Sequence, residues 1–398
     1  MASEASAIEL RLNEPQRAGV RAGLLTLALF SIGHFFIDLY SSALGVFQPV
    51  LGDKLGLSLT EAGMLGGLLI FASSVTQPAY GYLSDRFHSR MFSALAPAVA
   101  GIFISSLGLA PSFGWLAVMV LLGGSGIASF HPQASSRATS GISGRRAGWM
   151  AVFISSGSLG MAIGPAYFSA LLTRAGASRS WWGALPGIAI TIVLLAMLPA
   201  KPRAIGHPRH RFDLAPLKAV WKPLTVLYLL VFIRSILQIV FTQLLPLFLH
   251  RERGFSLTRA SLALSLYLTC GAVGGFLGGP FADRFGGRRV ILISMAGCLP
   301  FLALFFMASG ALSLIGLALG GLMLLFTTPV NVVMAQDLVP SQSGTISALM
   351  MGFAWGMAGL IFIPLVGWAG DHFTLYRALF SLLVFPVIGI FLTFKLPK

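Results

Sequence analysis

The stretch Leu57-Ser58-Leu59-Thr60-Glu61-Ala62 recurs at an offset of 198 residues as Phe255-Ser256-Leu257-Thr258-Arg259-Ala260. A second group of residues matches at the same offset. Gly81, Asp85, Arg86, Phe87 and Arg90 recur as Gly279, Asp283, Arg284, Phe285 and Arg288. Because the matches keep the same order in both copies, we infer that the chain consists of two parallel copies of one unit.

The composition around this repeat is that of a membrane protein. Of the 398 residues, 56% are hydrophobic and only 10% are charged, whereas soluble domains carry about 25% charged residues. Runs of about 20 apolar residues, the length that crosses a bilayer, occur six times in each copy. They lie at 22–48, 58–82, 91–110, 115–137, 147–172, 181–199, 221–249, 257–282, 289–308, 312–336, 342–369 and 373–394. The predicted fold class is therefore all-α integral membrane, with twelve transmembrane helices.

The connections between these runs predict the domain boundaries and the orientation. Residues 200–220 form the longest polar, Pro-rich stretch, which predicts an N-terminal half at 1–199, a linker at 200–220 and a C-terminal half at 221–398. Most Lys and Arg residues fall in the connections on the side of the two termini, and positive residues collect on the cytoplasmic side. Residues 1–19 lack the apolar core of a signal peptide. We expect a bacterial inner-membrane protein with both termini cytoplasmic, and we attribute the net charge of +15 to topology and not to nucleic-acid binding.

The repeated loop carries a recognisable motif. Gly-x-Leu-x-Asp-Arg, followed by a basic residue, starts at Gly81 and recurs without the Leu at Gly279. The sequence thereby resembles the major facilitator superfamily, in which two six-helix halves enclose a midplane site. The resemblance implies a cytoplasmic latch; the alternative is a solvated loop whose charges only set the orientation. The latch residues would be Asp85, Arg86, Arg90, Asp283, Arg284 and Arg288.

Other stretches resemble one branch of that superfamily, the fosmidomycin-resistance exporters. The matches run over residues 33–40, 76–82, 130–134, 335–340 and 352–357. The chain has Gln133 where that family usually has Glu, which removes one carboxylate that could carry a proton. The glycine-rich run from Gly157 to Pro165 also resembles a motif of the superfamily's antiporters, although small residues at this spacing equally predict close helix packing.

Ionisable residues inside the apolar runs indicate a site. A charge in the bilayer costs at least about 2.5–3.5 kcal/mol on insertion scales, so such residues usually face a wet cavity or one another. His34 and Asp38 are four residues apart and therefore share a helix face. We expect Asp38, assisted by His34, to carry a coupling proton. The alternative is a buried hydrogen-bonded pair that fixes helix packing.

Arg234 is the corresponding charge in the second half. The repeat offset sets it at the level of Phe36, and the first and seventh spans face each other in the superfamily. We therefore predict that Arg234 and Asp38 approach across the cavity, where the guanidinium can bind a carboxylate or phosphonate bidentately. A permanent structural ion pair is the alternative. The other predicted substrate contacts are His131, Gln133, Gln238, Gln243 and Asn331, although His131 can also be a packing residue.

The remaining polar residues of the spans have less specific roles. Arg137 and Asp337 lie near the cytoplasmic ends of their spans, so we assign them to gating, with snorkelling as the alternative for Arg137. Cys270 and Cys298 lie in apolar runs, which predicts small buried hydrophobic residues and neither a disulfide nor a metal site. No nucleophile elbow, metal-ligand cluster or phosphate-binding loop stands on a connection, so we expect neither a cofactor nor enzymatic activity.

Together these features predict a secondary active transporter. The resemblance implies proton-coupled efflux, by antiport, of a small polar or anionic drug-like compound such as a phosphonate antibiotic. The alternative is an uncoupled or proton-symport carrier of a small organic anion or metabolite. We expect a monomer whose partners are the substrate, protons and membrane lipid.

Overall fold

The computed structural model describes residues 14–87, 89–140, 142, 146–199 and 215–396, which are helical and contain no strand. Within these residues, twelve helical segments are long and apolar enough to cross a membrane, which confirms the predicted number. The first six consist of α2 (Glu14–Ser41) with α3 (Leu44–Leu55); α4 (Leu59–Ile70), η1 (Phe71–Val75) and α5 (Gln77–Phe87); α6 (Met91–Ala94), α7 (Ala96–Ser105) and η2 (Ser106–Leu109); α8 (Phe113–Arg137); α9 (Arg146–Ala175); and η3 (Ala177–Ala184) with α10 (Leu185–Met197).

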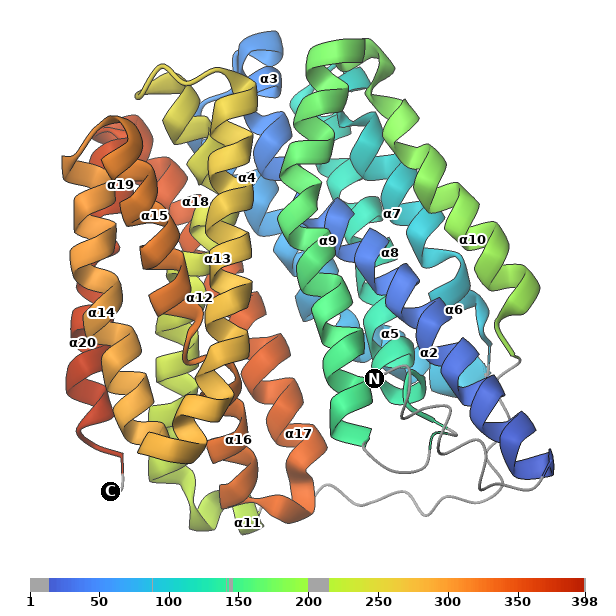
Figure 1. Cartoon of the computed structure of the whole chain (residues 1–398). Helices are drawn as coiled ribbons and strands as arrows, with labels where there is room; N and C mark the ends of the chain where they lie inside the picture. The colour runs from blue at the N-terminus through green and yellow to red at the C-terminus, as the bar shows by residue number, and fades with distance from the viewer. Residues whose placement is uncertain (1–13, 88, 141, 143–145, 200–214, 397–398) are drawn as a thin grey trace.

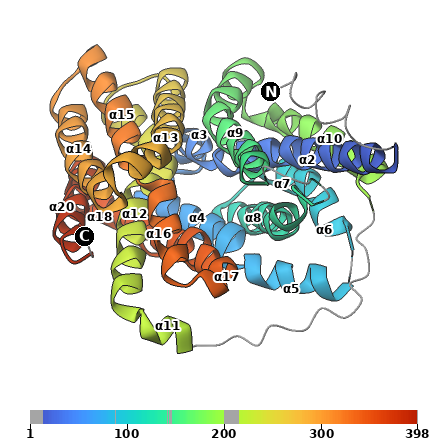
Figure 2. The ribbon, with the colours of Figure 1, turned by 60° about the horizontal axis from the view of Figure 1, so that its bottom comes forward.

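The second six follow the short helix α11 (Ala215–Ala219). They consist of α12 (Trp221–Arg251); α13 (Leu257–Phe285); α14 (Gly287–Met307); α15 (Gly310–Leu325) with α16 (Thr328–Leu338) and η4 (Pro340–Gln342); α17 (Ser343–Ser347), η5 (Ala348–Phe353) and α18 (Ala354–His372); and α19 (Leu375–Ser381) with α20 (Val384–Thr393). The two groups stand side by side, and α2 begins at the same end of the molecule at which α20 ends (Figures 1 and 2). The predicted linker falls largely on residues 200–214, outside the described residues, so the domain boundaries stay a prediction.

The repeat has a structural counterpart at the start of the second span of each half. Ser58 caps α4 by accepting a hydrogen bond from the backbone N–H of Glu61, at 3.1 Å. Ser256, at the equivalent position, caps α13 by accepting from the N–H of Arg259, at 3.3 Å. Helices start in both places because a serine hydroxyl satisfies an N–H that has no partner within the helix.

The outer surface is apolar, as contact with lipid requires. Large hydrophobic side chains such as Ile192, Phe276, Met307 and Phe391 are more than 60% exposed. In water such a surface would be unfavourable by about 25 cal/mol for each Å² of apolar area, whereas in a bilayer it is solvated by lipid tails.

The two halves are joined at the end opposite to the termini, which we call the closed end. Here the carboxylate of Asp371, at the end of α18, accepts hydrogen bonds from the backbone N–H groups of Leu59 (2.8 Å) and Thr60 (2.7 Å) at the start of α4. Arg251 at the end of α12 donates to the carbonyl oxygen of Leu57 at 3.3 Å. Both contacts connect one half with the other, so the closed end is fastened by polar bonds.

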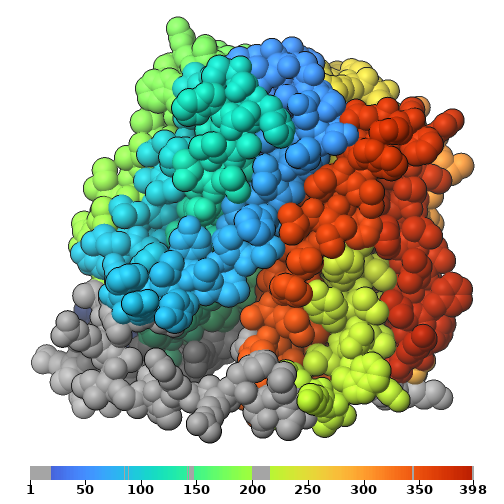
Figure 3. Space-filling view, turned by 180° about the vertical axis from the view of Figure 1, so that it is seen from behind, coloured from blue at the N-terminus to red at the C-terminus, as the bar shows by residue number. Residues whose placement is uncertain are grey.

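Glycines let the spans of the two halves come close below these bonds. A Cβ atom on Gly63 of α4 would lie 2.7 Å from the carbonyl oxygen of Ile363 in α18, and a Cβ on Gly67 would lie 2.8 Å from the Pro364 ring. Near the middle of the same two spans, the π-helical turns η1 and η5 face each other, and Gly356 lies against Val75. Towards the end that carries the termini, the surface is hollowed between the halves, above the grey atoms of Figure 3.

Candidate functional site

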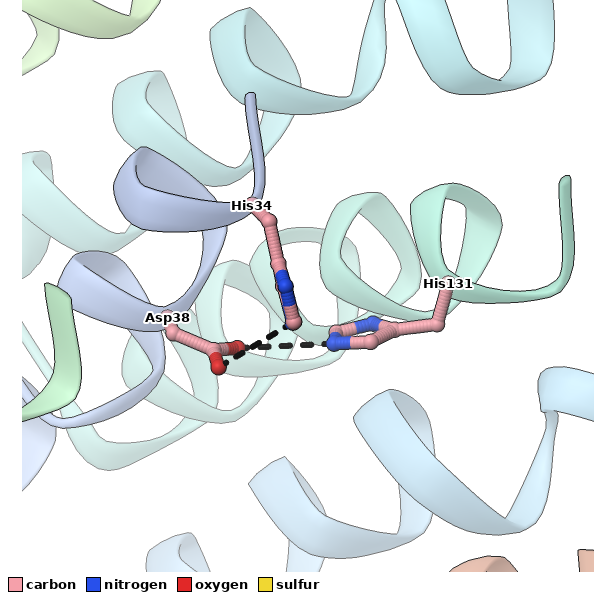
Figure 4. A group of neighbouring side chains, drawn as sticks. All are labelled: His34, Asp38 and His131. Carbon is pink, nitrogen blue, oxygen red and sulfur yellow. Dashed lines mark ion pairs between the residues drawn. The ribbon is translucent and has the colours of Figure 1, made fainter. Parts of the chain in front are cut away.

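The first part of the candidate site is a cluster of His34, Asp38 and His131. His34 and Asp38 lie on α2, and His131 reaches them from α8 (Figure 4). Nε2 of His34 is 3.3 Å from Oδ2 of Asp38, and Nε2 of His131 is 3.4 Å from Oδ1. The predicted pairing of His34 with Asp38 is therefore present, and His131 belongs to the same cluster.

The hydrogen bonds of the two imidazoles determine which nitrogen faces the carboxylate. Nδ1 of His34 lies 2.8 Å from the carbonyl oxygen of Phe153, and Nδ1 of His131 lies 3.0 Å from that of Ile127. Because a carbonyl oxygen can only accept, each Nδ1 must carry a hydrogen, and the Nε2 of a neutral ring is then a bare lone pair. Two lone pairs facing the oxygens of Asp38 repel them. A proton shared between an Nε2 atom and the carboxylate, or a cation placed between them, relieves this repulsion.

The cluster is enclosed by aromatic rings and by a glycine of α9. The His34 ring stacks on Phe153 with a centroid distance of 4.3 Å. A Cβ atom on Gly157 would lie 2.5 Å from both Oδ2 of Asp38 and Nε2 of His34. Gly160 and Gly164, further along α9, lie equally close to the backbone of α2. The small-residue spacing in α9 therefore packs this helix against α2, as the packing interpretation predicted.

The second part of the site surrounds Arg234 on α12, whose side chain is buried. Its guanidinium donates hydrogen bonds to Oε1 of Gln238 (2.6 Å), Oγ1 of Thr328 (3.2 Å) and Oγ of Ser235 (3.3 Å). All three acceptors are neutral, and among the described residues no carboxylate lies within 4.0 Å of this guanidinium. A buried charge without a counter-ion costs several kcal/mol, so the surroundings of Arg234 favour an anion.

Several buried polar atoms of the second half also lack a hydrogen-bond partner among the described residues. They are Nε of Arg234, Oε1 of Gln243 on α12, both side-chain polar atoms of Asn331 on α16, the hydroxyl of Tyr267 on α13 and the hydroxyl of Thr327. Native proteins leave few buried polar groups unsatisfied, because each one costs about 1–3 kcal/mol. Those best placed to meet a ligand at Arg234 are its own Nε and the amide of Asn331, which lies one helical turn after Thr328 on α16.

The predicted contact between Arg234 and Asp38 is not formed in this structure. Asp38 is bound to the histidines of its own half, and Arg234 is bound to Gln238, Ser235 and Thr328 of the other half. The repeat offset predicts the depth of a residue in the membrane, but the direction of its side chain depends on the rotation of the helix about its axis. The two charges therefore form separate centres, one in each half.

The predicted substrate contact of Gln133 stays a prediction, because in this structure its side chain is bonded within its own half. Its amide oxygen accepts from the hydroxyl of Ser93, and its amide nitrogen donates to the carbonyl oxygen of Ser89 at 2.9 Å. Gln133 is only 2% exposed and connects α8 with the start of the third span. Two residues along an α-helix are separated by about 200°, so His131 and Gln133 necessarily point in opposite directions.

The predicted gating residues lie at the end of the molecule that carries the termini. Arg90 donates to the carbonyl oxygen of Leu198, and its repeat partner Arg288 donates to that of Phe394 at 3.1 Å. Each acceptor lies at the end of the last span of the half that carries the arginine. These arginines thus stabilise helix ends where the dipole is negative, and in this structure they do not connect the two halves.

The other predicted gating residues have the following surroundings. Arg137 donates to the carbonyl oxygen of Pro199 at 2.9 Å and lies over the Phe30 ring. Arg284 lies over the ring of Phe285, and Arg86 over that of Phe87. Asp283 and Asp337 are exposed, and the side chain of Asp85 lies outside the described residues. The latch between the halves stays a prediction for a conformation in which this end is closed.

Three features of the structure were not predicted from the sequence. Tyr267 is fully buried beside Arg234, and its only sequence signal is a hydroxyl in an apolar run. Asp371 connects the two halves at the closed end, and the sequence shows it only as an acidic residue at the end of a span. The three donors His34, Asp38 and His131 lie within 4.8 Å of one another and could also hold a metal ion, which the sequence analysis did not anticipate. Cys270 and Cys298 are free thiols.

Comparison with known proteins gives consistent matches over nearly the whole chain. The family model of the Major Facilitator Superfamily matches residues 30–363 and 227–398. The fosmidomycin resistance protein of Escherichia coli (strain K12) is 28% identical over 386 residues, which cover 93% of this chain and 92% of that protein. The uncharacterized MFS-type transporter YfnC of Bacillus subtilis (strain 168) is 30% identical, with coverage of 94% and 92%.

A solved structure shows the same fold. It is that of a bacterial homologue of the human lysosomal transporter Spinster, in an inward-facing and occupied conformation. It superimposes with a TM-score of 0.77 at 16% sequence identity and covers 96% of this chain and 97% of that one.

Proposed function

Because this chain belongs to the major facilitator superfamily and is a membrane transporter, we propose that it exports a small anionic compound by antiport with protons. The observation that carries the proposal is the separation of two charged centres. One half holds a buried guanidinium that has no counter-ion among the described residues, and the other holds a carboxylate between two imidazoles. The first centre is suited to an anion and the second to a proton.

The substrate class follows from the chemistry around Arg234. A guanidinium offers a planar set of donors that matches a carboxylate, phosphate or phosphonate. The unpartnered amide of Asn331 and the hydroxyls of Tyr267 and Thr327 offer further donors on the same helices. The similarity to the fosmidomycin resistance protein of Escherichia coli supports a phosphonate antibiotic as one such substrate.

The proton site is Asp38 with His34 and His131. Histidine is the side chain that changes charge between about pH 5 and 8, and here two histidines adjoin a carboxylate. Their Nε2 atoms face Asp38 favourably only when a proton lies between a ring nitrogen and the carboxylate. Loss of that proton would leave two lone pairs against a carboxylate, and movement of α2 or α8 would relieve the repulsion. A change of protonation can therefore favour one conformation over another.

The transport direction and the orientation are part of the same proposal. We place the protein in a bacterial inner membrane with both termini in the cytoplasm, because Lys and Arg collect in the connections on that side. The closed end then faces the outside, and the hollow between the halves faces the cytoplasm. A substrate from the cytoplasm would reach Arg234, and rocking of the two halves would expose it to the outside.

Transport by proteoliposomes tests this proposal. Purified protein is reconstituted, and efflux of a radiolabelled phosphonate is measured with and without an inward proton gradient. We expect the gradient to accelerate efflux in the wild type but not in Asp38→Asn, which cannot bind or release a proton. Efflux that ignores the gradient in the wild type would favour the alternative, an uncoupled carrier of small organic anions. Acceleration by the opposite gradient would favour symport.

A thermal-shift screen tests the anion site separately. Phosphonates, organic acids, sugars and neutral antibiotics are compared with wild type and Arg234→Ala. We expect anions to stabilise the wild type and to lose that effect in the variant. An anion that stabilises both equally would show that its site does not include Arg234.

A further inference from the structure

We propose that His34, Asp38 and His131 form a binding site for one divalent transition-metal ion, with Zn²⁺ as the reference ion. Two imidazole nitrogens and one carboxylate are a donor set that first-row metal ions of this kind prefer. The site goes beyond the transport function proposed above and stands on the geometry of the donors, whatever the substrate and direction of transport.

The distances between the donors match those around a metal ion. Zinc binds imidazole nitrogen at about 2.0–2.1 Å and carboxylate oxygen at about 2.0–2.2 Å, so neighbouring ligands of a tetrahedral ion lie about 3.4 Å apart. The two N–O distances in the cluster are 3.3 and 3.4 Å. All three donors lie within 4.8 Å of one another, so only small side-chain movements are needed to close them on one ion.

The orientation of the rings matches a metal site as well. A metal-bound histidine almost always donates its other N–H to a carbonyl or carboxylate, which holds the ring in place. Nδ1 of His34 donates to the carbonyl oxygen of Phe153, and Nδ1 of His131 donates to that of Ile127. Both Nε2 lone pairs therefore already point at Asp38, and a cation between them replaces repulsion by coordination.

The cluster also leaves room and an approach for an additional ligand. The His131 side chain is 25% exposed, whereas those of His34 and Asp38 are 9% and 13% exposed. Three protein ligands with a fourth position on the exposed side correspond to an open metal site, in which water or an oxyanion completes the coordination. Gly157 contributes by having no side chain, since a Cβ there would lie 2.5 Å from the donors.

Metal binding can be measured without substrate or gradient. The full-length protein, purified through a tag without histidine that is then removed, is titrated with Zn²⁺ in a calorimeter at pH 7.5 and pH 6.0. We expect one ion per chain, bound more weakly at pH 6.0 because protons compete for the imidazoles. Co²⁺ in the same site should give the strong visible absorption of a tetrahedral complex.

Three variants locate the site. His131→Gln should weaken zinc binding by more than the roughly 10–100-fold that changes outside the ligand set cost. His131→Glu should bind zinc more tightly than His131→Gln, because a carboxylate is also a zinc ligand and the two side chains have the same size and reach, so this difference excludes a folding defect. The control is His250→Gln, since His250 forms the other described His–Asp pair, at 3.8 Å from an exposed Asp53. This control should bind zinc as the wild type does.

Three results would overturn the proposal: no saturable zinc binding, equal binding by wild type and His131→Gln, or binding by His131→Glu that is no tighter than binding by His131→Gln. Its failure is distinguishable from that of the transport mechanism. Zinc binding by a protein whose transport ignores the proton gradient would refute only the coupling. Gradient-dependent transport without zinc binding would refute only the metal site.

Discussion

Replacing Asp371 by alanine is expected to loosen the closed end of the molecule. The carboxylate of Asp371 is the only described partner outside α4 for the N–H groups of Leu59 and Thr60, and it also accepts from the Thr60 hydroxyl at 2.6 Å. The helix's own capping box, Ser58 with Glu61, satisfies the next N–H group. Asp371 therefore acts as a capping residue supplied by the other half.

The size of the effect follows from this role. Loss of a capping side chain costs about 0.5–2 kcal/mol, typically about 1 kcal/mol. Asp371 is exposed, so its charge is partly screened. We therefore take the free energy lost with this cap as about 1 kcal/mol, which shifts an equilibrium roughly fivefold. All of this stabilisation is lost when the halves separate at this end. The open population at the closed end should therefore rise about fivefold in Asp371→Ala, and less in Asp371→Asn, which keeps one acceptor oxygen.

Distances between spin labels can measure this population. Labels are placed at Ser112 and Phe373, which are exposed at the closed end of the first and second half, after Cys270 and Cys298 are replaced by alanine. Pulsed electron resonance then gives the distance distribution, in which the long-distance fraction reports opening. An unchanged distribution in Asp371→Ala would refute the capping role.

The control for this experiment is Asp53→Ala. Asp53 is an exposed carboxylate at the same end, and its described partner, His250, lies 3.8 Å away. Removing it changes the local charge as much as removing Asp371 but breaks no helix cap. A shift of equal size in this control would show that general electrostatics, and not the cap, holds the end closed.

Three further predictions concern the interior. Gly160→Ala should destabilise the protein by about 1–3 kcal/mol, because the added Cβ would collide with the backbone of Phe35; a lower thermal midpoint would show it. The control Gly148→Ala on the same helix should leave the midpoint unchanged, because nothing lies within 4 Å of its Cβ. Gln133→Leu should also destabilise the protein, by about 1–3 kcal/mol, because Ser93 and Ser89 lose their hydrogen bonds to the amide. Anion affinity in a binding titration should stay unchanged. Arg234→Lys should weaken anion binding at least about tenfold, because an ammonium cannot form the bidentate pair; unchanged affinity would contradict the site.

Much of this architecture could be predicted from the sequence. The number and limits of the spans depend on local composition, because about 20 apolar residues are needed wherever a helix crosses the bilayer. The equivalence of Ser58 and Ser256 followed from the repeat, because similar segments cap similar helices. His34 and Asp38 could be paired because residues four apart share a helix face.

What the tertiary structure decided is the direction in which each buried side chain points. A span that is apolar on every side has no polar face to show how it is rotated, so nothing local indicated that His131 joins Asp38 while Gln133 turns away. The partners of Arg234 and the cap formed by Asp371 likewise join segments far apart in the chain. Depth in the membrane is set by the hydrophobic length of each span, but rotation and partner choice are set by how the spans pack against one another.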